Sequence, residues 1–352
     1  MPQAKPHDPE RILVVRTDRI GDVLLSTPVL SVLRARYPAS HIAVLVAPHT
    51  LDAVAGHPAV NSVLTDDAAG LHRGPAGFWK LVTRIRNERF DTVLLLHPTA
   101  RLAALCCLAR IPRRVGTGYR LYSFLFNLRV YDHRREAKRH EVEYNLRLAE
   151  ALTGCAAVAD PYIDIPADAR QTIDRRMTQW GVDPEKPVVV LHPGSGGSAR
   201  NWPEASFAML SEKLSETGIQ VIVSGGPGEE ALAQRVAAAH PTGIVADRMS
   251  LKELAALLSV CRLCVTNSTG PLHIAAGIGT PTVALFCPVG PCSPTRWGPF
   301  GSGHRVLKPD VPTCSGCIGE KCPYFDCMNR ISVETVFHAT QEILATSVQT
   351  VG

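Results

Sequence analysis

The sequence predicts an α/β protein built from two Rossmann-like domains that face each other across a cleft. Apolar runs of strand length alternate with helix-patterned segments from the N-terminus, and a second alternating series begins at Pro187. A length of 352 residues suits two domains. We expect an N-terminal domain at 1–165, a C-terminal domain at 166–330, and a helix within 331–352 that packs back on the N-terminal domain.

Buried strands and amphipathic helices alternate in the first half. Strands are expected at Ile12–Val15, Ile42–Val46, Val60–Leu64, Thr92–Leu96 and Arg114–Gly116. Helices are expected at Val23–Tyr37, Phe78–Glu88, Leu102–Arg110 and Glu141–Leu152. This rhythm predicts a parallel sheet with helices on both faces. The stretch 159–169 contains prolines and no clear periodicity, so it is the expected linker.

The second half repeats the pattern. Strands are expected at Val188–Leu191, Ile219–Val223, Leu263–Thr266 and Thr282–Phe286. Helices are expected at Gln171–Trp180, Pro203–Glu216, Glu229–Ala239, Leu251–Val260, Pro271–Gly277 and Val333–Leu344.

Composition indicates a soluble globular protein, with 45% hydrophobic and 20% charged residues. A net charge of +5 is mild and does not point to nucleic acid. No apolar run reaches the ~18 residues of a membrane helix, and the first residues lack the apolar core of a signal peptide. We therefore expect a cytoplasmic protein, in which the eleven cysteines form no disulfide framework.

The loop after the first strand, Arg16–Leu25, joins a buried strand to a helix start. Asp22 lies at the beginning of that helix, where a carboxylate can cap the helix or act as a catalytic base at the edge of the sheet. Asp18 lies in the same loop and is a rival for either role.

Three loops in the second half could hold a nucleotide, because each follows a strand and precedes a helix. His192–Pro203 is rich in glycine and carries Arg200; Ser224–Glu230 has a glycine turn before Glu229; Thr266–His273 supplies hydroxyls and a histidine. The plainer alternatives are a flexible turn, first-turn acids favoured by the helix dipole, and a structural histidine.

The absence of three common nucleotide- and metal-binding motifs limits the reactions that the sequence supports. The chain has no GxxxxGK[ST] motif and no GxGxxG after the first strand, which disfavours a kinase and an ordinary dehydrogenase. It also has no DxD triplet to hold a metal between two phosphates. We therefore expect a metal-independent transfer from a nucleotide sugar, without a cofactor.

Together these stretches resemble glycosyltransferase family 9, the ADP-heptose:lipopolysaccharide heptosyltransferases. The matching residues are Arg16–Asp22, His192–Gly194, Arg200–Pro203, Glu229, Met249–Ser250 and Asn267–His273. The resemblance covers nearly the whole chain. It implies a GT-B fold, with the acceptor on the N-terminal domain and the donor on the C-terminal domain. It also implies inversion at the anomeric carbon without a metal.

The resemblance implies a role for each matching residue. Asp22 would deprotonate the acceptor hydroxyl. Donor-binding residues would be Ser195, Arg200, Glu229, Met249, Ser268, Thr269, Gly270, Pro271 and His273. Among these, Arg200 would neutralise the departing diphosphate, Glu229 would bind ribose and Met249 would pack on adenine. Ser268 stands where several members carry Asp, which affects the hold on the donor sugar.

Aromatic and basic residues crowd the stretch Tyr119–Arg139 of the expected acceptor domain. This surface would suit a lipid-linked anionic saccharide and contact with the inner membrane surface, whereas a solvated charged face is the plainer alternative. Acceptor-binding candidates are Arg19, Arg134 and Arg135. We accordingly expect a cytoplasmic protein that is peripheral at the inner face of the plasma membrane.

Four cysteines lie close together near the C-terminus: Cys314, Cys317, Cys322 and Cys327. Their spacing does not form two clean CxxC pairs, so we favour reduced thiols packing a surface loop over a structural metal site.

The leading hypothesis is a heptosyltransferase that uses ADP-heptose and the lipopolysaccharide inner core. One alternative keeps the chemistry and changes the sugar or the acceptor. Alternatives of other classes are a non-catalytic nucleotide or saccharide binder, and a metal-stabilised interaction protein. A binder has no need of Asp22, so that residue discriminates.

Overall fold

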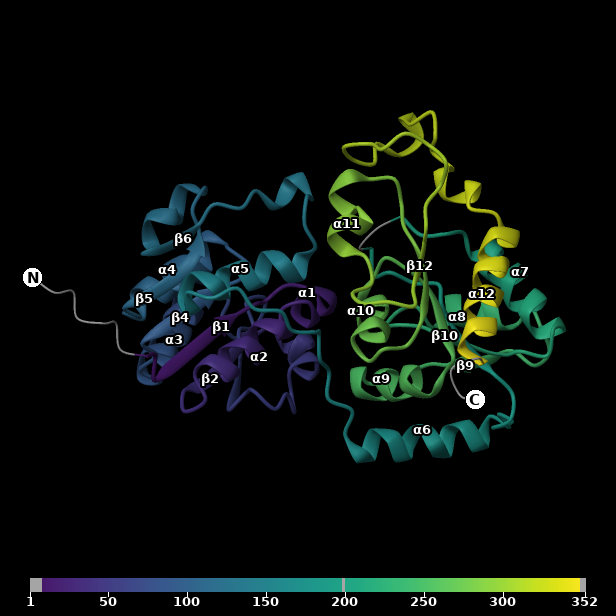
Figure 1. Ribbon diagram of the computed structural model, residues 1–352, viewed down its shortest axis with the longest axis horizontal. Helices are drawn as coiled ribbons and strands as arrows, with labels where there is room; N and C mark the ends of the chain where they lie inside the picture. The colour runs from purple at the N-terminus through teal and green to yellow at the C-terminus, as the bar shows by residue number, and fades with distance from the viewer. Residues whose placement is uncertain (1–7, 198–199, 349–352) are drawn as a thin grey trace, which may run out of the picture. The chain divides into compact units, whose positions relative to one another are not determined.

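The computed structural model describes residues 8–197 and 200–348, which form two compact units (Figure 1). The first unit contains the chain up to Arg134 together with Glu141–Asp164. The second contains Arg135–His140 and the chain from Ile165 onward. The chain passes between the units after Asp164, beside the expected boundary at 165/166. Each unit is an α/β structure around one parallel sheet, as predicted.

The sheet of the first unit has the strand order β3-β2-β1-β4-β5-β6. Its strands are β1 (Arg11–Val15), β2 (His41–Val46), β3 (Ser62–Thr65), β4 (Thr92–Leu95), β5 (Arg113–Thr117) and β6 (Leu128–Val130). The surrounding helices are α1 (Ile20–Leu24), α2 (Thr27–Arg36), α3 (Gly74–Asn87), α4 (Ala100–Leu108) and α5 (Glu141–Thr153). Short 3-10 helices are η1 (Pro48–Ala53), η2 (Leu121–Leu125) and η3 (Arg134–Glu136).

The expected single helix at Val23–Tyr37 is wrong, because the chain forms two helices there. α1 ends at Leu24. The hydroxyls of Ser26 and Thr27 donate hydrogen bonds to the carbonyls of Asp22 and Leu24, in place of the backbone N–H groups that a continuing helix would supply. Pro28 then stands at the start of α2, where its missing N–H is harmless. The break leaves α1 as one short turn of helix, and Asp22 lies within that turn.

The second sheet has the order β12-β11-β10-β7-β8-β9. Its strands are β7 (Val188–His192), β8 (Gln220–Ser224), β9 (Ile244–Ala246), β10 (Leu263–Asn267), β11 (Thr282–Leu285) and β12 (Arg305–Leu307). Its helices are α6 (Ala167–Gln179), α7 (Glu204–Glu216), α8 (Glu230–Ala237), α9 (Leu251–Val260), α10 (Gly270–Gly277), α11 (Pro294–Trp297) and α12 (Val333–Val348). Short 3-10 helices are η4 (Gly290–Cys292), η5 (Gly319–Lys321) and η6 (Cys327–Arg330).

The C-terminal helix belongs to the second unit, whereas we expected it on the N-terminal domain. α12 contacts α7, β10 and β11. Val336 and Phe337 of α12 join the same buried cluster as Trp202 and Phe207. The apolar face of the helix is therefore used within the second unit.

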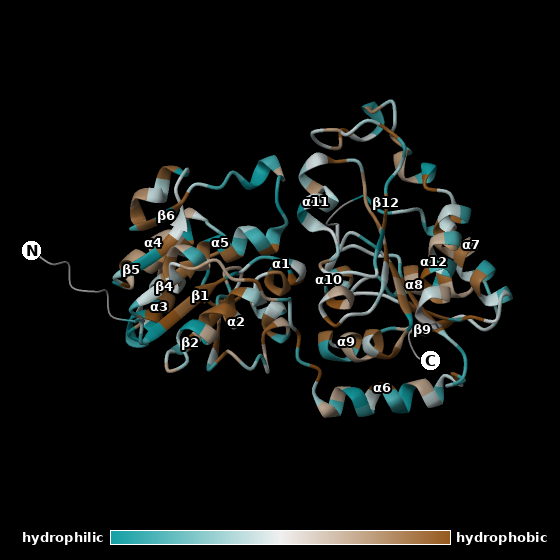
Figure 2. Cartoon of the chain, viewed as in Figure 1, coloured by the Kyte–Doolittle hydropathy of each residue, from teal (hydrophilic) through white to brown (hydrophobic). Residues whose placement is uncertain are grey.

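Hydropathy follows the layers of each unit. Figure 2 shows brown, apolar colour along central strands such as β1 and largely teal, polar colour along α6. Strands with neighbours on both faces must be apolar throughout, and β1 and β7 are buried along almost their whole length. In the described part of the chain, none of the helices has the length and apolar character needed to cross a bilayer.

Both sheets reverse their strand order beside the first strand of the unit. In the first unit β1 pairs with β2 on one side and with β4 on the other. In the second unit β7 is likewise flanked by β8 and β10. Ligands of open α/β sheets bind at the carboxyl ends of the strands at such a reversal. The loops after β1, β4, β7 and β10 therefore lie where ligand-binding sites are expected.

Candidate active site

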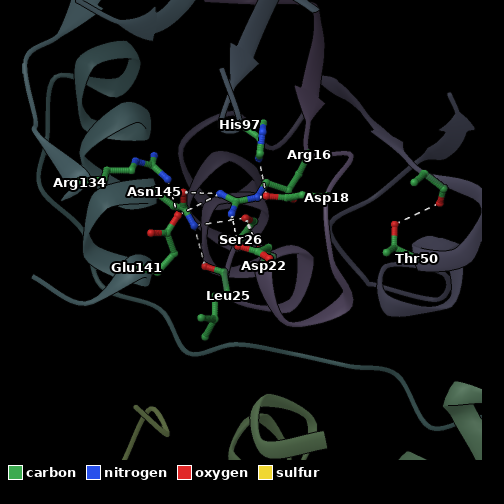
Figure 3. A network of polar contacts seen from close by, with 11 residues as sticks. Arg16, Asp18, Asp22, Leu25, Ser26, Thr50, His97, Arg134, Glu141 and Asn145 are labelled. Carbon is green, nitrogen blue, oxygen red and sulfur yellow. Dashed lines mark hydrogen bonds and ion pairs between the residues drawn. The ribbon is translucent and has the colours of Figure 1, made fainter. Parts of the chain in front are cut away.

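Arg16, the first residue after β1, organises the site of the first unit (Figure 3). Its side chain is only 3% exposed, and its guanidinium contacts three carboxylates. Nε lies 2.7 Å from Asp18 Oδ1, Nη2 lies 2.6 Å from Asp22 Oδ1, and Nη1 lies 3.1 Å from Glu141 Oε1. Burial alone would lower the pKa of Arg16, but the three carboxylates raise it, so the group stays charged.

The N-terminal part of α5 holds this loop in place. Glu141 is fully buried and binds Arg134 as well as Arg16. Asn145, one turn later, accepts a hydrogen bond from Arg16 and donates from Nδ2 to the carbonyl of Leu25 at 3.0 Å. The loop after β1 is thus fixed by side chains from a helix more than 100 residues later in the sequence.

Asp18 is fully engaged. One carboxylate oxygen accepts from Arg16, and the other lies 2.5 Å from Nδ1 of His97, in the loop after β4. Burial would raise the pKa of the Asp18 carboxyl, but Arg16 and His97 outweigh it and lower the pKa to about 2. Asp18 is therefore a permanent anion that orients the imidazole of His97.

Asp22 has a different environment, although it shares Arg16 with Asp18. Its Oδ1 accepts from Arg16, while its Oδ2 has no hydrogen-bond partner among the described residues. Burial raises the pKa of Asp22, and the nearby Asp18 and Glu141 raise it further against the attraction of Arg16. The N-cap of α1 is Arg19 rather than either acid, so capping does not account for Asp22. A carboxylate with one available oxygen and a raised pKa suits a general base.

In the second unit, Glu229 joins two of the three predicted nucleotide loops. Its Oε1 accepts from the backbone N–H groups of Ser195 and Gly196, and its Oε2 accepts from that of Gly226, each at 2.9 Å. Burial would raise the pKa of Glu229, but these hydrogen bonds and the nearby His192 lower it. His192 is itself buried, which lowers its pKa to about 4 and leaves it neutral at pH 7.

Gly194 is a glycine because Glu229 leaves no room for a side chain. A Cβ at this position would lie 2.0 Å from Oε2 and 2.2 Å from Oε1 of Glu229. The close approach brings the loop after β7 against the carboxylate that also holds the loop after β8. The glycine-rich turn predicted at His192–Pro203 is therefore a fixed structure where the chain passes Glu229.

Asn267, the last residue of β10, ties the third loop to the first. Its side chain accepts from the backbone N–H of Trp202 at 2.9 Å and donates to the carbonyl of Pro193 at 2.7 Å. All three predicted nucleotide loops thus meet at the carboxyl edge of the second sheet. Met249 lies at the same edge, half-buried in the loop after β9.

The N-terminus of α10 carries a buried histidine whose Nδ1 lacks a partner among the described residues. Thr269 is the N-cap, and its side chain forms no capping hydrogen bond to the described residues; Gly270 and Pro271 open the helix. His273 is buried, and its Nδ1 has no hydrogen-bond partner among residues 8–197 and 200–348. Burial lowers the pKa of His273 to about 3, so the ring is neutral. A helix N-terminus beside a neutral histidine with an unbonded ring nitrogen is suited to binding an anion.

Arg200 contacts the cysteine-rich segment 314–327. Its Nη1 lies 3.3 Å from Sγ of Cys317, its Nη2 donates to the carbonyl of Phe325 at 2.8 Å, and its guanidinium lies over the Phe325 ring. The cysteines at 314, 317, 322 and 327 are free thiols. No group of three or more His, Cys, Asp or Glu side chains in the described chain is placed to hold a metal. The segment acts here as a support for Arg200.

The predicted acceptor arginines differ in their environments. Arg19 is exposed at the start of α1, and Arg135 is exposed on η3. Arg134 is mostly buried, binds Glu141 and lies over the ring of Tyr144. Its guanidinium is therefore part of the network that supports the loop after β1.

The chain can now be compared with known proteins. A family model described as glycosyltransferase family 9 (heptosyltransferase) matches residues 78–325. The chain belongs to glycosyltransferase family 9. It is 27% identical over 315 residues to lipopolysaccharide heptosyltransferase 2 of Escherichia coli (strain K12), a match that covers 85% of this chain and 88% of that protein.

Solved structures of this family share the whole architecture. The glycosyltransferase family 9 protein of Veillonella parvula DSM 2008 superposes with a TM-score of 0.85 at 26% identity, covering 96% of this chain and 98% of that one. An Escherichia coli heptosyltransferase with ADP-2-deoxy-2-fluoro heptose has the same fold, with a TM-score of 0.71, 20% identity and coverage of 94% and 99%. The family 9 chain is thus a glycosyltransferase of GT-B fold, from the heptosyltransferase family of lipopolysaccharide biosynthesis.

Sequence reasoning gave no role to several residues of this candidate site. Arg16 stood inside a matching motif without a function, and His97, Glu141 and Asn145 were not singled out. A charged residue placed directly after a buried strand was the available signal for Arg16. The partners after β4 and on α5 carry no local signal, because only the folded unit brings them together.

Proposed function

We propose that this enzyme transfers heptose from ADP-heptose to the inner core of lipopolysaccharide, with inversion at the anomeric carbon and without a metal. Three things support the proposal. The chain belongs to the heptosyltransferase family. A protein of the same fold holds an ADP-heptose analogue. The loops at the carboxyl edge of the second sheet offer partners for each part of an ADP-sugar.

The second unit would bind the donor. Met249 would pack on adenine, and the carboxylate of Glu229 would accept hydrogen bonds from the ribose hydroxyls. The diphosphate would lie at the N-terminus of α10, where Ser268 and Thr269 supply hydroxyls and Nδ1 of His273 donates. Ser195 lies in the neighbouring loop and would complete the donor site. Arg200 would add the positive charge that stabilises ADP as it leaves.

The first unit would bind the acceptor and supply the base, and the free oxygen of Asp22 is the observation that carries this assignment. Asp22 Oδ2 takes the proton of the acceptor hydroxyl while the hydroxyl oxygen bonds to C1 of the heptose. The bond between C1 and the diphosphate oxygen breaks on the opposite face. One displacement gives one inversion, and ADP leaves with the bonding electrons.

The acceptor is an anionic saccharide carried on a lipid in this proposal, which gives the exposed Arg19 and Arg135 a purpose. Cations at the edge of the acceptor site would pair with its phosphate or carboxylate groups. The enzyme would therefore work at the inner face of the plasma membrane as a peripheral protein.

The test is a panel of nucleotide sugars, including ADP-heptose, assayed for binding and transfer, followed by Asp22→Asn. We expect ADP-heptose to be the preferred donor. Asp22→Asn should leave donor affinity near wild type and lower kcat by ~100-fold or more, as loss of a general base does. Near-normal turnover in Asp22→Asn would reject Asp22 as the base. A preference for another nucleotide sugar would favour the alternative in which the donor is not ADP-heptose. The reason for considering that alternative is that Ser268 stands where several family members carry Asp.

A further inference from the structure

The 3-10 helix η2 presents two large apolar side chains to solvent. Leu121 is 99% exposed and Phe124 is 71% exposed. We call these two residues the apolar tip. Nearly complete exposure means that Leu121 projects from the surface instead of lying along it. Single exposed apolar residues are common, but two in one turn of 3-10 helix call for a partner.

The turn that carries the apolar tip is firmly held. Phe126, directly after η2, is buried in the core of the first unit, and Tyr122 packs against the same core. The hydroxyl of Tyr122 donates to the carbonyl of Pro98 at 2.5 Å. The backbone N–H of Arg120 bonds the hydroxyl of Ser123 at 2.9 Å. The tip is therefore a preformed projection on a rigid base.

The chain segment that carries the apolar tip has charges of one sign. Between Ala109 and Tyr131 the chain carries five arginines and no acidic residue. Arg120 precedes Leu121, is exposed and lies over the ring of Tyr119. Arg129 of β6 is exposed and bonds the carbonyl of Phe126 through Nε. We call Arg120 and Arg129 the arginine rim. Tyr131, just after β6, is 66% exposed.

We propose that the apolar tip and the arginine rim dock the first unit on an anionic lipid bilayer. Leu121 and Phe124 enter the interfacial region, while Arg120 and Arg129 pair with lipid phosphates and Tyr131 lies at headgroup level. The proposal deepens the proposed function, because a lipid-held acceptor requires the enzyme to work at a membrane. A projecting tip suits a surface that can be penetrated. Protein interfaces instead bury about 800 Å² per partner over complementary surfaces.

The test is co-sedimentation of the full chain with vesicles of phosphatidylcholine alone or mixed with phosphatidylglycerol. Wild type should bind the anionic vesicles, bind phosphatidylcholine weakly, and lose binding as salt is raised. The double variant Leu121→Ser/Phe124→Ser should bind anionic vesicles with an affinity reduced by about tenfold or more. Arg120→Glu should also weaken binding. The control Leu71→Ser removes an apolar side chain that is 63% exposed elsewhere in the same unit, and should bind as wild type does.

Equal binding by the tip variant and wild type would overturn the proposal. Loss of self-association in the tip variant, measured by sedimentation velocity, with unchanged vesicle binding would also overturn it and assign the tip to a second copy of the chain. Melting temperature checks the fold of each variant. Vesicle binding needs no donor sugar. The vesicle assay can therefore succeed or fail independently of the test of the proposed transferase activity.

Discussion

Asp18 and Asp22 share the guanidinium of Arg16, yet the pKa values of their carboxyl groups shift in opposite directions. Arg16 lies 2.7 Å from one and 2.6 Å from the other. Asp18 gains a second donor, His97, and its pKa falls to about 2. Asp22 gains no second donor among the described residues, and burial raises its pKa. Environments that separate two carboxyl groups in this way divide their roles, with one as a fixed anion and the other as a proton acceptor.

The pH dependence of kcat/KM should report Asp22. The base must be ionised to accept a proton, so activity should fall as pH decreases through the raised pKa of Asp22. The acidic limb should therefore lie above the ordinary Asp value of about 3.9. Glu141→Gln removes a negative charge that raises this pKa, so the limb should move to lower pH. Steady-state rates across pH measure both shifts, and a limb that moves to higher pH in Glu141→Gln would contradict the assignment.

The same two acids should have opposite effects on stability. A raised folded-state pKa means that folding disfavours ionised Asp22, so at pH 7 the charge costs stability, and Asp22→Asn should raise Tm. The depressed pKa of Asp18 stabilises the fold above the unfolded value of about 3.9, and that contribution is lost as pH falls through about 2. Asp18→Asn should lower the free energy of unfolding at pH 7 by an amount on the order of 2 kcal/mol, and Tm should fall with it.

Calorimetry at pH 7 and under acid conditions provides the measurement for both variants. Below the unfolded pKa, the gain in Asp22→Asn should disappear, because wild-type Asp22 is then protonated as well. Two variants that shift Tm in the same direction at pH 7 would show that Arg16 does not distinguish the two carboxyl groups.

Gly194→Ala should weaken binding of ADP. The new Cβ would lie 2.0 Å from Oε2 of Glu229, so the carboxylate must move and lose backbone hydrogen bonds. Loss of such bonds costs about 1–3 kcal/mol, which corresponds to roughly tenfold or more in affinity. Isothermal titration with ADP measures the effect. Gly316→Ala is the matched control, because its Cβ would meet nothing within 4 Å. Equal affinity for ADP in the two variants would argue against Glu229 as a donor ligand.

Arg134→Met and Arg135→Met should distinguish an arginine that stabilises the fold from one that binds the acceptor. Arg134 binds the buried Glu141, and breaking a buried ion pair costs about 3 kcal/mol or more. Arg134→Met should therefore lower the free energy of unfolding in urea. Arg135 is exposed, so Arg135→Met should leave stability unchanged and raise the acceptor KM. A stability loss in Arg135→Met equal to that in Arg134→Met would remove the distinction.

The fold was predictable because strands buried on both faces are continuous apolar runs. Val188–Leu191 and Thr92–Leu96 were located within a residue or two of β7 and β4. No strand was predicted at β6, β9 or β12, each only three residues long. β12, Arg305–Leu307, lies at the edge of its sheet and is largely exposed. Short edge strands bury too little for hydrophobicity to reveal them.

The candidate site was predictable only where its residues share one loop. Asp18 and Asp22 lie in the loop and the helix start that directly follow a buried strand, which marks them from sequence alone. Nothing local links Asp18 to His97, because their contact depends on β1 pairing with β4. The contact of Arg200 with the Phe325 carbonyl likewise joins positions 125 residues apart. Tertiary pairing, rather than composition, decides which candidate groups meet.

The dependence of Arg16 on Glu141 has a consequence for biosynthesis. These residues are separated by 125 positions, and the Arg16 guanidinium is buried in the finished unit. A chain emerging from the ribosome has β1 and its loop long before α5, so until α5 docks the loop cannot adopt its final electrostatic environment. We expect nascent chains that end before Glu141 to leave this loop open to proteases, and the candidate active site to be among the last parts of the first unit to mature.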